Sequence, residues 1–326
     1  MKIRNILSWF VLAAVVALLA IGFANFQEIS DWLKLRNYQP GSRIVELADK
    51  TTMKDGARRV FYVNHPQLND KQEFKGNCYD KAKEETIVLG CYVSSIDRKG
   101  IYLLNVTDKR LEGVVEVTAA HEMLHAMYER LDKKERQRID RLTIDFFTSS
   151  TDERLKQTIE NYRAKDPAVV PSELHSILPT EVHTLTPELE QYYVQYFSDR
   201  QKVVEFSDKY EKAFIDIETK AEAYEDKLAD LKQKIETNKL QIESMGKEID
   251  ERQKELEALL SSNQVSEYNQ QVPKYNRLVE EYNRMVNQTK QTIASYNELL
   301  EQRNQLIIQQ HELYEAIDSN AINEKR

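Results

Sequence analysis

The chain contains few of the residues that interrupt helices. Among its 326 residues there are only 8 glycines and 7 prolines, whereas 31% of the residues are charged. A scarcity of helix breakers in such a highly charged chain predicts long helices with solvent-exposed faces. The length is sufficient for about two domains.

The sequence also lacks any block of basic residues, and its net charge is −8. Proteins that bind nucleic acids need basic patches to neutralise the phosphates. The charge pattern therefore argues against nucleic acid as a partner.

Cysteine is scarce too, since Cys78 and Cys91 are the only two in the chain. They bracket a polar turn that is followed by a strand-like segment. Outside the cytoplasm, two thiols placed in this way favour a disulfide, which would stabilise the fold by about 3 kcal/mol. A pair of buried free thiols is the alternative.

A long uncharged apolar run occurs at the N-terminus, from Ile6 to Ala24, and Lys2 and Arg4 precede it. A helix of this length extends roughly 28 Å, close to the hydrocarbon thickness of a bilayer. The run therefore predicts a signal-anchor transmembrane helix within residues 1–26. The N-terminus would be cytoplasmic and the bulk of the chain extracytoplasmic. The alternative is a cleaved signal peptide, which would release a secreted protein.

Residues 27–41 are expected to form a juxtamembrane spacer, and residues 42–200 a compact α+β domain. Within this domain, three segments have the composition of strands, namely RRVFYV (58–63), ETIVLGCYVSS (85–95) and KGIYLLNVT (99–107). From Val114 onward the apolar residues follow a helical spacing.

In the last part of the chain, apolar residues recur every seven positions, from Phe214 to Leu256 and again from Val272 to Ile307. A sustained seven-residue repeat with charges between predicts a coiled coil. Two arms joined by a polar turn at about 261–273 favour an all-α antiparallel hairpin over residues 201–326, with Pro273 opening the second arm. A parallel dimer of each arm is the alternative. A protein partner on the coiled coil is a further expectation.

The segment VTAAHEMLHAMYERL, Val117–Leu131, contains two histidines four residues apart and a glutamate directly after the first. On a helix, His121 and His125 share one face and can bind one metal ion. Glu122 lies one step round the helix and can accept a proton from a zinc-activated water. The spacing thus predicts a Zn²⁺ site for hydrolysis. An ordinary core helix with incidental histidines is the alternative.

These residues resemble the HExxH motif of the zincin metallopeptidases. The neighbouring positions fit the uncharged, proline-free pattern of that family, and they are Thr118, Ala119, Ala120, Met123, Leu124, Ala126 and Met127. Tyr128 and Leu131 stand where the metzincin branch has glycine and histidine, which excludes that branch. The resemblance covers residues 58–200 and implies a zincin-like fold. It also implies an edge strand that binds extended substrate, for which GIYLLNV (100–106) is the candidate.

A catalytic zinc needs a third protein ligand. In the gluzincin branch a later helix supplies a glutamate within an Asn-Glu-x-x-Ser/Ala pattern, and SELHS (172–176) resembles this pattern except at Ser172. The resemblance nominates Glu173, with Glu181 as the second candidate. His175 and His183 are further candidates, either as ligands or as donors to a developing oxyanion.

Together these features predict a membrane-anchored, extracytoplasmic zinc endopeptidase, held in the membrane by residues 6–24, that cleaves a peptide or protein substrate. The alternative is a non-catalytic cell-envelope adaptor or spacer. In that case the zincin-like domain would bind metal or peptide without turnover, and the coiled coil would carry the main function. The presence of Glu122 favours the enzyme, because metal binding alone does not require it.

Overall fold

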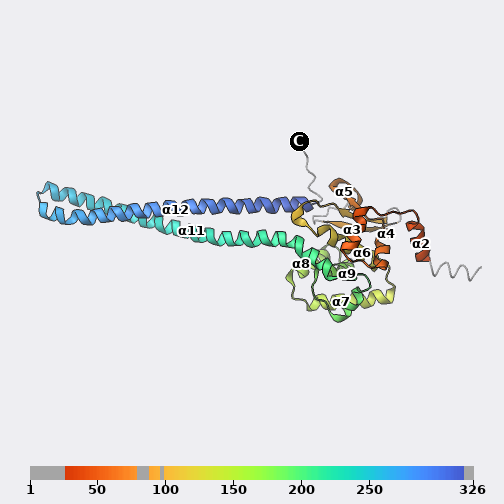
Figure 1. The fold of residues 1–326 in the computed structure, drawn as a ribbon. Coiled ribbons are helices and arrows are strands. Elements are labelled where there is room, and N and C mark those ends of the chain that lie inside the picture. The colour runs from red at the N-terminus through yellow and green to blue at the C-terminus, as the bar shows by residue number, and fades with distance from the viewer. Residues whose placement is uncertain (1–25, 79–87, 96–98, 319–326) are drawn as a thin grey trace, which may run out of the picture. The chain divides into compact units, whose positions relative to one another are not determined.

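The computed structural model describes residues 26–78, 88–95 and 99–318 (Figure 1). The chain divides into two units. The globular unit comprises Met1–Ala213 and Leu313–Arg326, and the hairpin unit comprises Phe214–Glu312.

The described part of the globular unit consists of helices and one small sheet. Its helices are α2 (Phe26–Leu35), α3 (Ser42–Lys50), α4 (Asp55–Val63), α5 (Lys71–Cys78), the 3₁₀ helix η1 (Lys109–Leu111), α6 (Val114–Glu129), α7 (Lys133–Ser149), α8 (Glu153–Lys165), α9 (Val170–Glu181) and α10 (Pro187–Tyr193). The strands are β1 (Gln67–Asn69), β2 (Gly90–Ser94) and β3 (Lys99–Leu104). They lie in the order β1-β3-β2, with β1 parallel and β2 antiparallel to β3.

The predicted α+β fold class is wrong, because the described residues are predominantly helical and contain only this three-stranded sheet. The segment RRVFYV, which has the composition of a strand, lies within α4. In this helix Ala57, Val60 and Phe61 are buried. Their i, i+3, i+4 spacing places them on one helical face, so burial follows the helical period rather than the alternation of a strand.

The expected edge strand is also different. Residues 99–104 form β3, which pairs with a strand on each side and is therefore the central strand of the sheet. The strand at the edge that contacts α6 is β2. Position in the sheet depends on pairing between distant segments, and the composition of a single segment carries no information about it.

The predicted fold class also included a transmembrane helix. Across residues 26–78, 88–95 and 99–318, no helix is both long enough and apolar enough to cross a membrane. The run from Ile6 to Ala24 lies outside the described residues. Within the expected spacer, α2 is a folded element that packs on the globular unit, where Asp31 accepts two hydrogen bonds from Arg130, at 2.7 and 3.0 Å.

Helix α6 occupies the centre of the globular unit and contacts β2, β3, α3, α4 and α9. Its N-cap, Gly113, has φ of 104°, and a Cβ there would lie 2.4 Å from the carbonyl oxygen of Phe206. Glycine is therefore required at this start of the helix. The buried carboxylate of Glu116 accepts hydrogen bonds from Arg43 at 3.0 Å and Lys50 at 3.2 Å, which ties α6 to α3.

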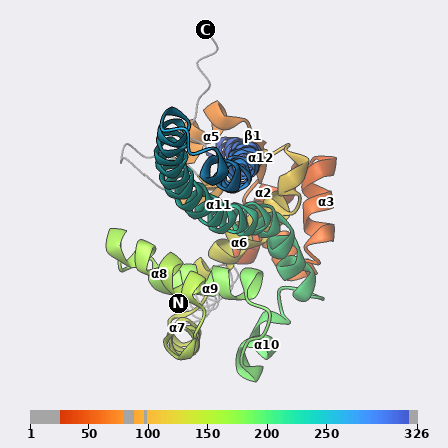
Figure 2. The same cartoon turned by 90° about the vertical axis from the view of Figure 1, so that its left-hand side faces the viewer.

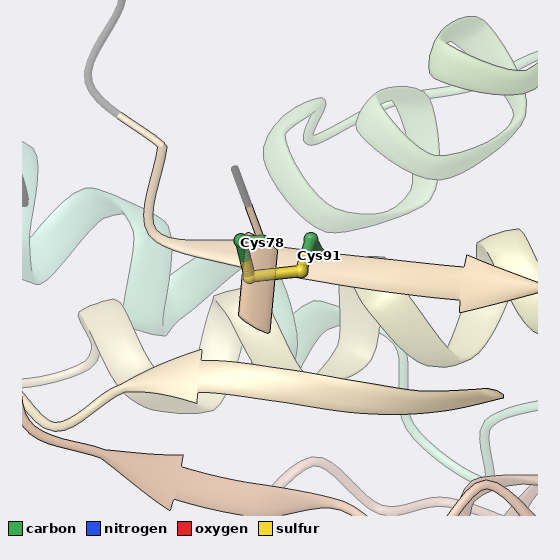
Figure 3. Close-up of a disulfide and its surroundings, with 2 residues drawn as sticks. All are labelled: Cys78 and Cys91. Atoms are coloured by element: carbon green, nitrogen blue, oxygen red, sulfur yellow. A yellow bond between two sulfur atoms is a disulfide. The ribbon is translucent and has the colours of Figure 1, made fainter. Parts of the chain in front are cut away.

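The predicted disulfide is confirmed. Cys78 at the end of α5 is bonded to Cys91 in β2, with a Cα–Cα distance of 5.8 Å (Figure 3). Both cysteines pack against a small buried cluster of Phe74, Tyr102 and Leu104. The bond therefore fastens the edge strand β2 to α5.

We expect the double substitution Cys78→Ser with Cys91→Ser to lower the free energy of unfolding of the globular unit by about 3 kcal/mol, because the open chain regains the entropy of a short loop. Urea denaturation followed by circular dichroism measures this difference. Reduction of the wild-type protein should give the same loss. Equal stability of the oxidised wild type and the double variant would contradict the expectation.

The hairpin unit consists of the greater part of two long helices, α11 (Gln201–Ser261) and α12 (Val265–Ile317), which run side by side in opposite directions (Figures 1 and 2). Arg303 donates to Glu225 across the pair at 2.8 Å. In the seam, Asn238 donates to Thr289 at 3.1 Å. A polar pair within an apolar seam sets the register of the two arms. The expected coiled coil is thus present.

The turn between the arms is short. Only residues 262–264 separate the two helices, and α12 begins at Val265. Pro273 was expected to open the second arm, but it lies inside α12. The polar residues before it continue the helix, so the arms are paired almost to their tips.

Candidate metal centre

The candidate metal site lies between two packed helices, α6 and α9. Helix α6 carries His121 and His125, and no glycine or proline interrupts it. Helix α9 begins at Val170 with Pro171 in its first turn, where the missing N–H of proline costs nothing. Glu173 also lies in this first turn, where the helix dipole favours a carboxylate.

Packing of these helices brings three donor groups together. The Nε2 atoms of His121 and His125 are 3.0 Å apart, and each lies 3.5 Å from an oxygen of Glu173. All three donor atoms lie within 4.8 Å of one another. A tetrahedral zinc with bonds of about 2.0–2.1 Å requires ligand atoms roughly 3.3 Å apart. The two nitrogens and the carboxylate, whose Oε2 faces His121 and whose Oε1 faces His125, therefore lie close to the spacing of such a site.

The charges in the cluster are those of a cation site. Burial lowers the pKa of His121. The carboxylates of Glu173, which His121 contacts, and of Glu122 have a larger effect in the opposite direction, and they raise the pKa of His121 to about 9. Burial lowers the pKa of His125 to about 4. The Oε2 atom of Glu173 is buried, lies 3.5 Å from Nε2 of His121 and accepts no hydrogen bond from the described residues. A buried carboxylate oxygen of this kind requires a positive partner.

Two further side chains support the donors. The Nδ1 atom of His125 is 2.8 Å from Oγ of Ser172, a contact that orients the imidazole with Nε2 towards the cluster. Tyr162 on α8 interacts with the Glu173 carboxylate through its hydroxyl group. Burial, and then the negative charges of Glu173 and Glu122, raise the pKa of Tyr162 above its ordinary value. The phenol is therefore protonated and can donate.

Glu122 is buried beside the three donors and is only 5% exposed. Burial raises the pKa of its carboxyl to about 7, although the charge of His121 and the backbone of Tyr92 act in the opposite direction. A carboxyl group with such a pKa can both accept and release a proton near neutral pH. Glu122 lies against the edge strand β2, which it meets at Gly90.

Gly90 in β2 makes room for Glu122. A Cβ at position 90 would lie 2.5 Å from Cγ2 of Thr118 and 2.7 Å from Oε1 of Glu122. Real Cβ atoms do not approach other atoms so closely, so any side chain at this position must displace the strand, Thr118 or the glutamate.

We therefore expect Gly90→Ala to reduce any activity that depends on Glu122 by roughly 10²-fold, because a shift of about 1 Å is enough for such a loss. Zinc affinity should change little, since the donor atoms are elsewhere. Gly56→Ala is the matched control, because a Cβ on Gly56 meets nothing within 4 Å. Unchanged kcat in Gly90→Ala would show that the position of Glu122 is not critical.

The structure places the two other histidine candidates away from the cluster. His175 is fully buried, its Nε2 lies 2.9 Å from the hydroxyl of Tyr192, and burial lowers its pKa to about 3. It packs among aromatic rings, those of Tyr128, Tyr192, Tyr193 and Tyr196. His183 is exposed and lies 3.1 Å from Asp208. Neither histidine is among the three grouped donors.

Glu181, the second candidate for the third ligand, is held by an ion pair. Its Oε2 lies 2.7 Å from Nη2 of Arg154, and Arg154 also contacts Glu211. Glu181 is close enough to influence His121 electrostatically but is not one of the grouped donors. Of the two glutamates, Glu173 has the geometry of a ligand.

Sequence reasoning missed four contributors to this site, namely Gly90, Tyr92, Tyr162 and Ser172. Ser172 was visible as a departure from the gluzincin pattern, and its position next to Glu173 was the available signal. The other three carry no local signal, because their roles depend on contacts between segments that are distant in the chain.

No protein-family model, curated protein or solved structure matches this chain.

Proposed function

We propose that this protein is a zinc-dependent peptidase in which His121, His125 and Glu173 hold the metal and Glu122 is the general base. The observation that carries the proposal is the grouping of three donor atoms within 4.8 Å beside a buried glutamate on the same helix as the two histidines. Two imidazoles and one carboxylate are a donor set of catalytic zinc sites, which keep a fourth position open.

The residues present fit a zinc ion in charge as well as in spacing. A divalent cation would supply the partner that Oε2 of Glu173 lacks among the described residues. It would also supply the positive charge that the Glu173 and Glu122 carboxylates favour at His121, whose pKa they raise. Ser172 holds His125 in the orientation that a metal ligand requires.

Bound zinc would polarise the scissile carbonyl group and lower the pKa of water to about 7. Glu122 accepts the proton of the attacking water and transfers it to the leaving amine. Tyr162 is the proposed hydrogen-bond donor to the oxyanion, because its phenol is protonated and lies near enough to Glu173 to lower the pKa of that carboxyl.

The proposed substrate is an extended peptide. Strand β2 pairs with β3 on one side, and none of the described strands pairs with its other side. A Cβ on Gly90 of β2 would lie 2.7 Å from Oε1 of Glu122, so this strand runs directly beside the general base. A free strand edge binds peptides by adding them as a further strand.

The proposed location is outside the cytoplasm, because the Cys78–Cys91 disulfide is typical of oxidising compartments.

The second candidate function is a non-catalytic adaptor in the cell envelope. The paired helices of the hairpin unit favour it, since a coiled coil of this kind can serve as a spacer or as a site for a protein partner. Glu122 has no role in that alternative.

Metal analysis and peptide cleavage by the purified full chain test the proposal. We expect a single bound zinc ion per chain and cleavage of unstructured peptides that a chelator abolishes and added zinc restores. Stoichiometric zinc without cleavage of a broad peptide library would favour the adaptor. Absence of zinc binding at neutral pH would contradict the peptidase.

For Tyr162→Phe we expect kcat to fall roughly 10²–10³-fold, the usual cost of removing an oxyanion donor, with little change in zinc affinity. Tyr128→Phe is the matched control, because that hydroxyl donates to Asp140 at 2.7 Å, outside the donor cluster. If Tyr162 only holds Glu173 in position, the substitution will instead weaken zinc binding.

A further inference from the structure

Helix α2 presents an apolar face to solvent. Four large side chains on it are 47–68% exposed, and they are Phe26, Ile29, Trp32 and Leu33. At 3.6 residues per turn these four positions fall within an arc of about 120°. An exposed row of this kind in a folded protein marks an interaction surface more often than chance.

The opposite face of α2 is fastened to the globular unit. Asp31 is almost fully buried and makes the paired hydrogen bonds to Arg130 at 2.7 and 3.0 Å. Near the end of the helix, the carbonyl oxygen of Lys34 lies 3.3 Å from Nε2 of His65. The helix cannot rotate without breaking these contacts, so its apolar face is held outward.

We propose that this apolar face lies in the headgroup region of a phospholipid bilayer, parallel to the membrane surface. The chain that leads into α2 supports a lipid partner, because residues 6–24 are an uncharged apolar run that ends two residues before Phe26. Tryptophan and phenylalanine are favoured at the headgroup level.

Charge supports the same partner. Lys34 and Arg36 are exposed at the end of the helix, and the guanidinium group of Arg36 lies 5.6 Å from the ring centroid of Trp32. Cationic side chains next to an apolar face attract anionic headgroups while their stems stay with the apolar layer. This combination favours a lipid surface as the occupant.

The fluorescence of Trp32 tests the proposal in the full chain. The chain has two tryptophans, so Trp9→Phe leaves Trp32 as the single fluorophore. We expect vesicles of phosphatidylcholine and phosphatidylglycerol with brominated acyl chains to quench Trp32 several-fold more than unbrominated vesicles. A tryptophan introduced by Ile144→Trp on α7, with Trp9 and Trp32 both replaced by phenylalanine, should show no such difference. Equal emission of Trp32 in both kinds of vesicle would overturn the proposal.

A second variant separates the face of α2 from the apolar run that precedes it. Ile29→Ser with Leu33→Ser should reduce the quenching of Trp32 by brominated lipid several-fold while circular dichroism stays unchanged. Quenching that persists in this variant would assign membrane proximity to residues 6–24 alone and overturn the role of α2. Shielding of Trp32 from acrylamide without lipid would show that protein covers the face, from residues 1–25 or a second copy, and would overturn it as well.

Discussion

Replacement of Glu122 by glutamine should reduce kcat by at least about 10²–10⁴-fold while the protein still binds zinc. Glutamine keeps the shape of the side chain and can still accept the hydrogen bond from Tyr92, but it cannot take a proton from water. The same group would serve as base and then as acid, so the loss should lie at the upper end of this range. Peptide cleavage and zinc content measured on one preparation give both quantities.

Glu116→Gln is the matched control for this experiment. Glu116 is a second buried glutamate on α6, but it pairs with Arg43 and Lys50 on α3 rather than facing the donor cluster. Its substitution should lower stability and leave kcat unchanged. Comparable losses of kcat in both variants would mean that Glu122 acts through the fold of α6, and the assignment of the general base would fail.

Zinc affinity should decrease in a graded way when the groups around the metal are altered. Glu173→Ala removes a ligand and should weaken binding by more than about 10²-fold, because loss of a supporting group alone costs roughly 10–100-fold. Ser172→Ala, which removes the contact to Nδ1 of His125, should fall within that smaller range. Glu181→Ala should have little effect, because Glu181 is paired with Arg154. Competition with a chromogenic chelator at fixed pH measures all three affinities.

The order of these effects identifies the third ligand. If Glu181→Ala releases zinc and Glu173→Ala does not, the third ligand is Glu181. Helix α9 would then be rotated in solution relative to its orientation in the structure. His125→Ala provides the reference for complete loss of a ligand. A value for Glu173→Ala far below that of His125→Ala would reduce Glu173 to a supporting role.

Several features of this protein follow from local sequence alone. Helical periodicity places residues four apart on one face, so the pair His121 and His125 with Glu122 between them was recognisable without a structure. The seven-residue repeat predicted the paired helices for a similar reason. With only two cysteines in the chain, one intramolecular disulfide was available, and Cys78–Cys91 forms it.

Local composition was misleading where a short apolar segment fits two structures. RRVFYV contains β-branched and aromatic residues, which favour strands. In the structure it lies within α4, where Ala57, Val60 and Phe61 are buried at helical spacing. The position of β3 at the centre of the sheet likewise depended on its pairing with β1 and β2. Composition sets a preference of about 1 kcal/mol or less per residue, which packing readily overrides.

The choice among Glu173, Glu181, His175 and His183 was decided by tertiary structure. These residues lie within or just after α9, and the sequence alone does not determine which face of α9 packs against α6. Packing turns Glu173 towards His121 and His125, buries His175 among tyrosines and leaves His183 with Asp208. A helix specifies its own spacing, but the rotation that aims one of its residues at a metal is set by the side chains it buries against its neighbours.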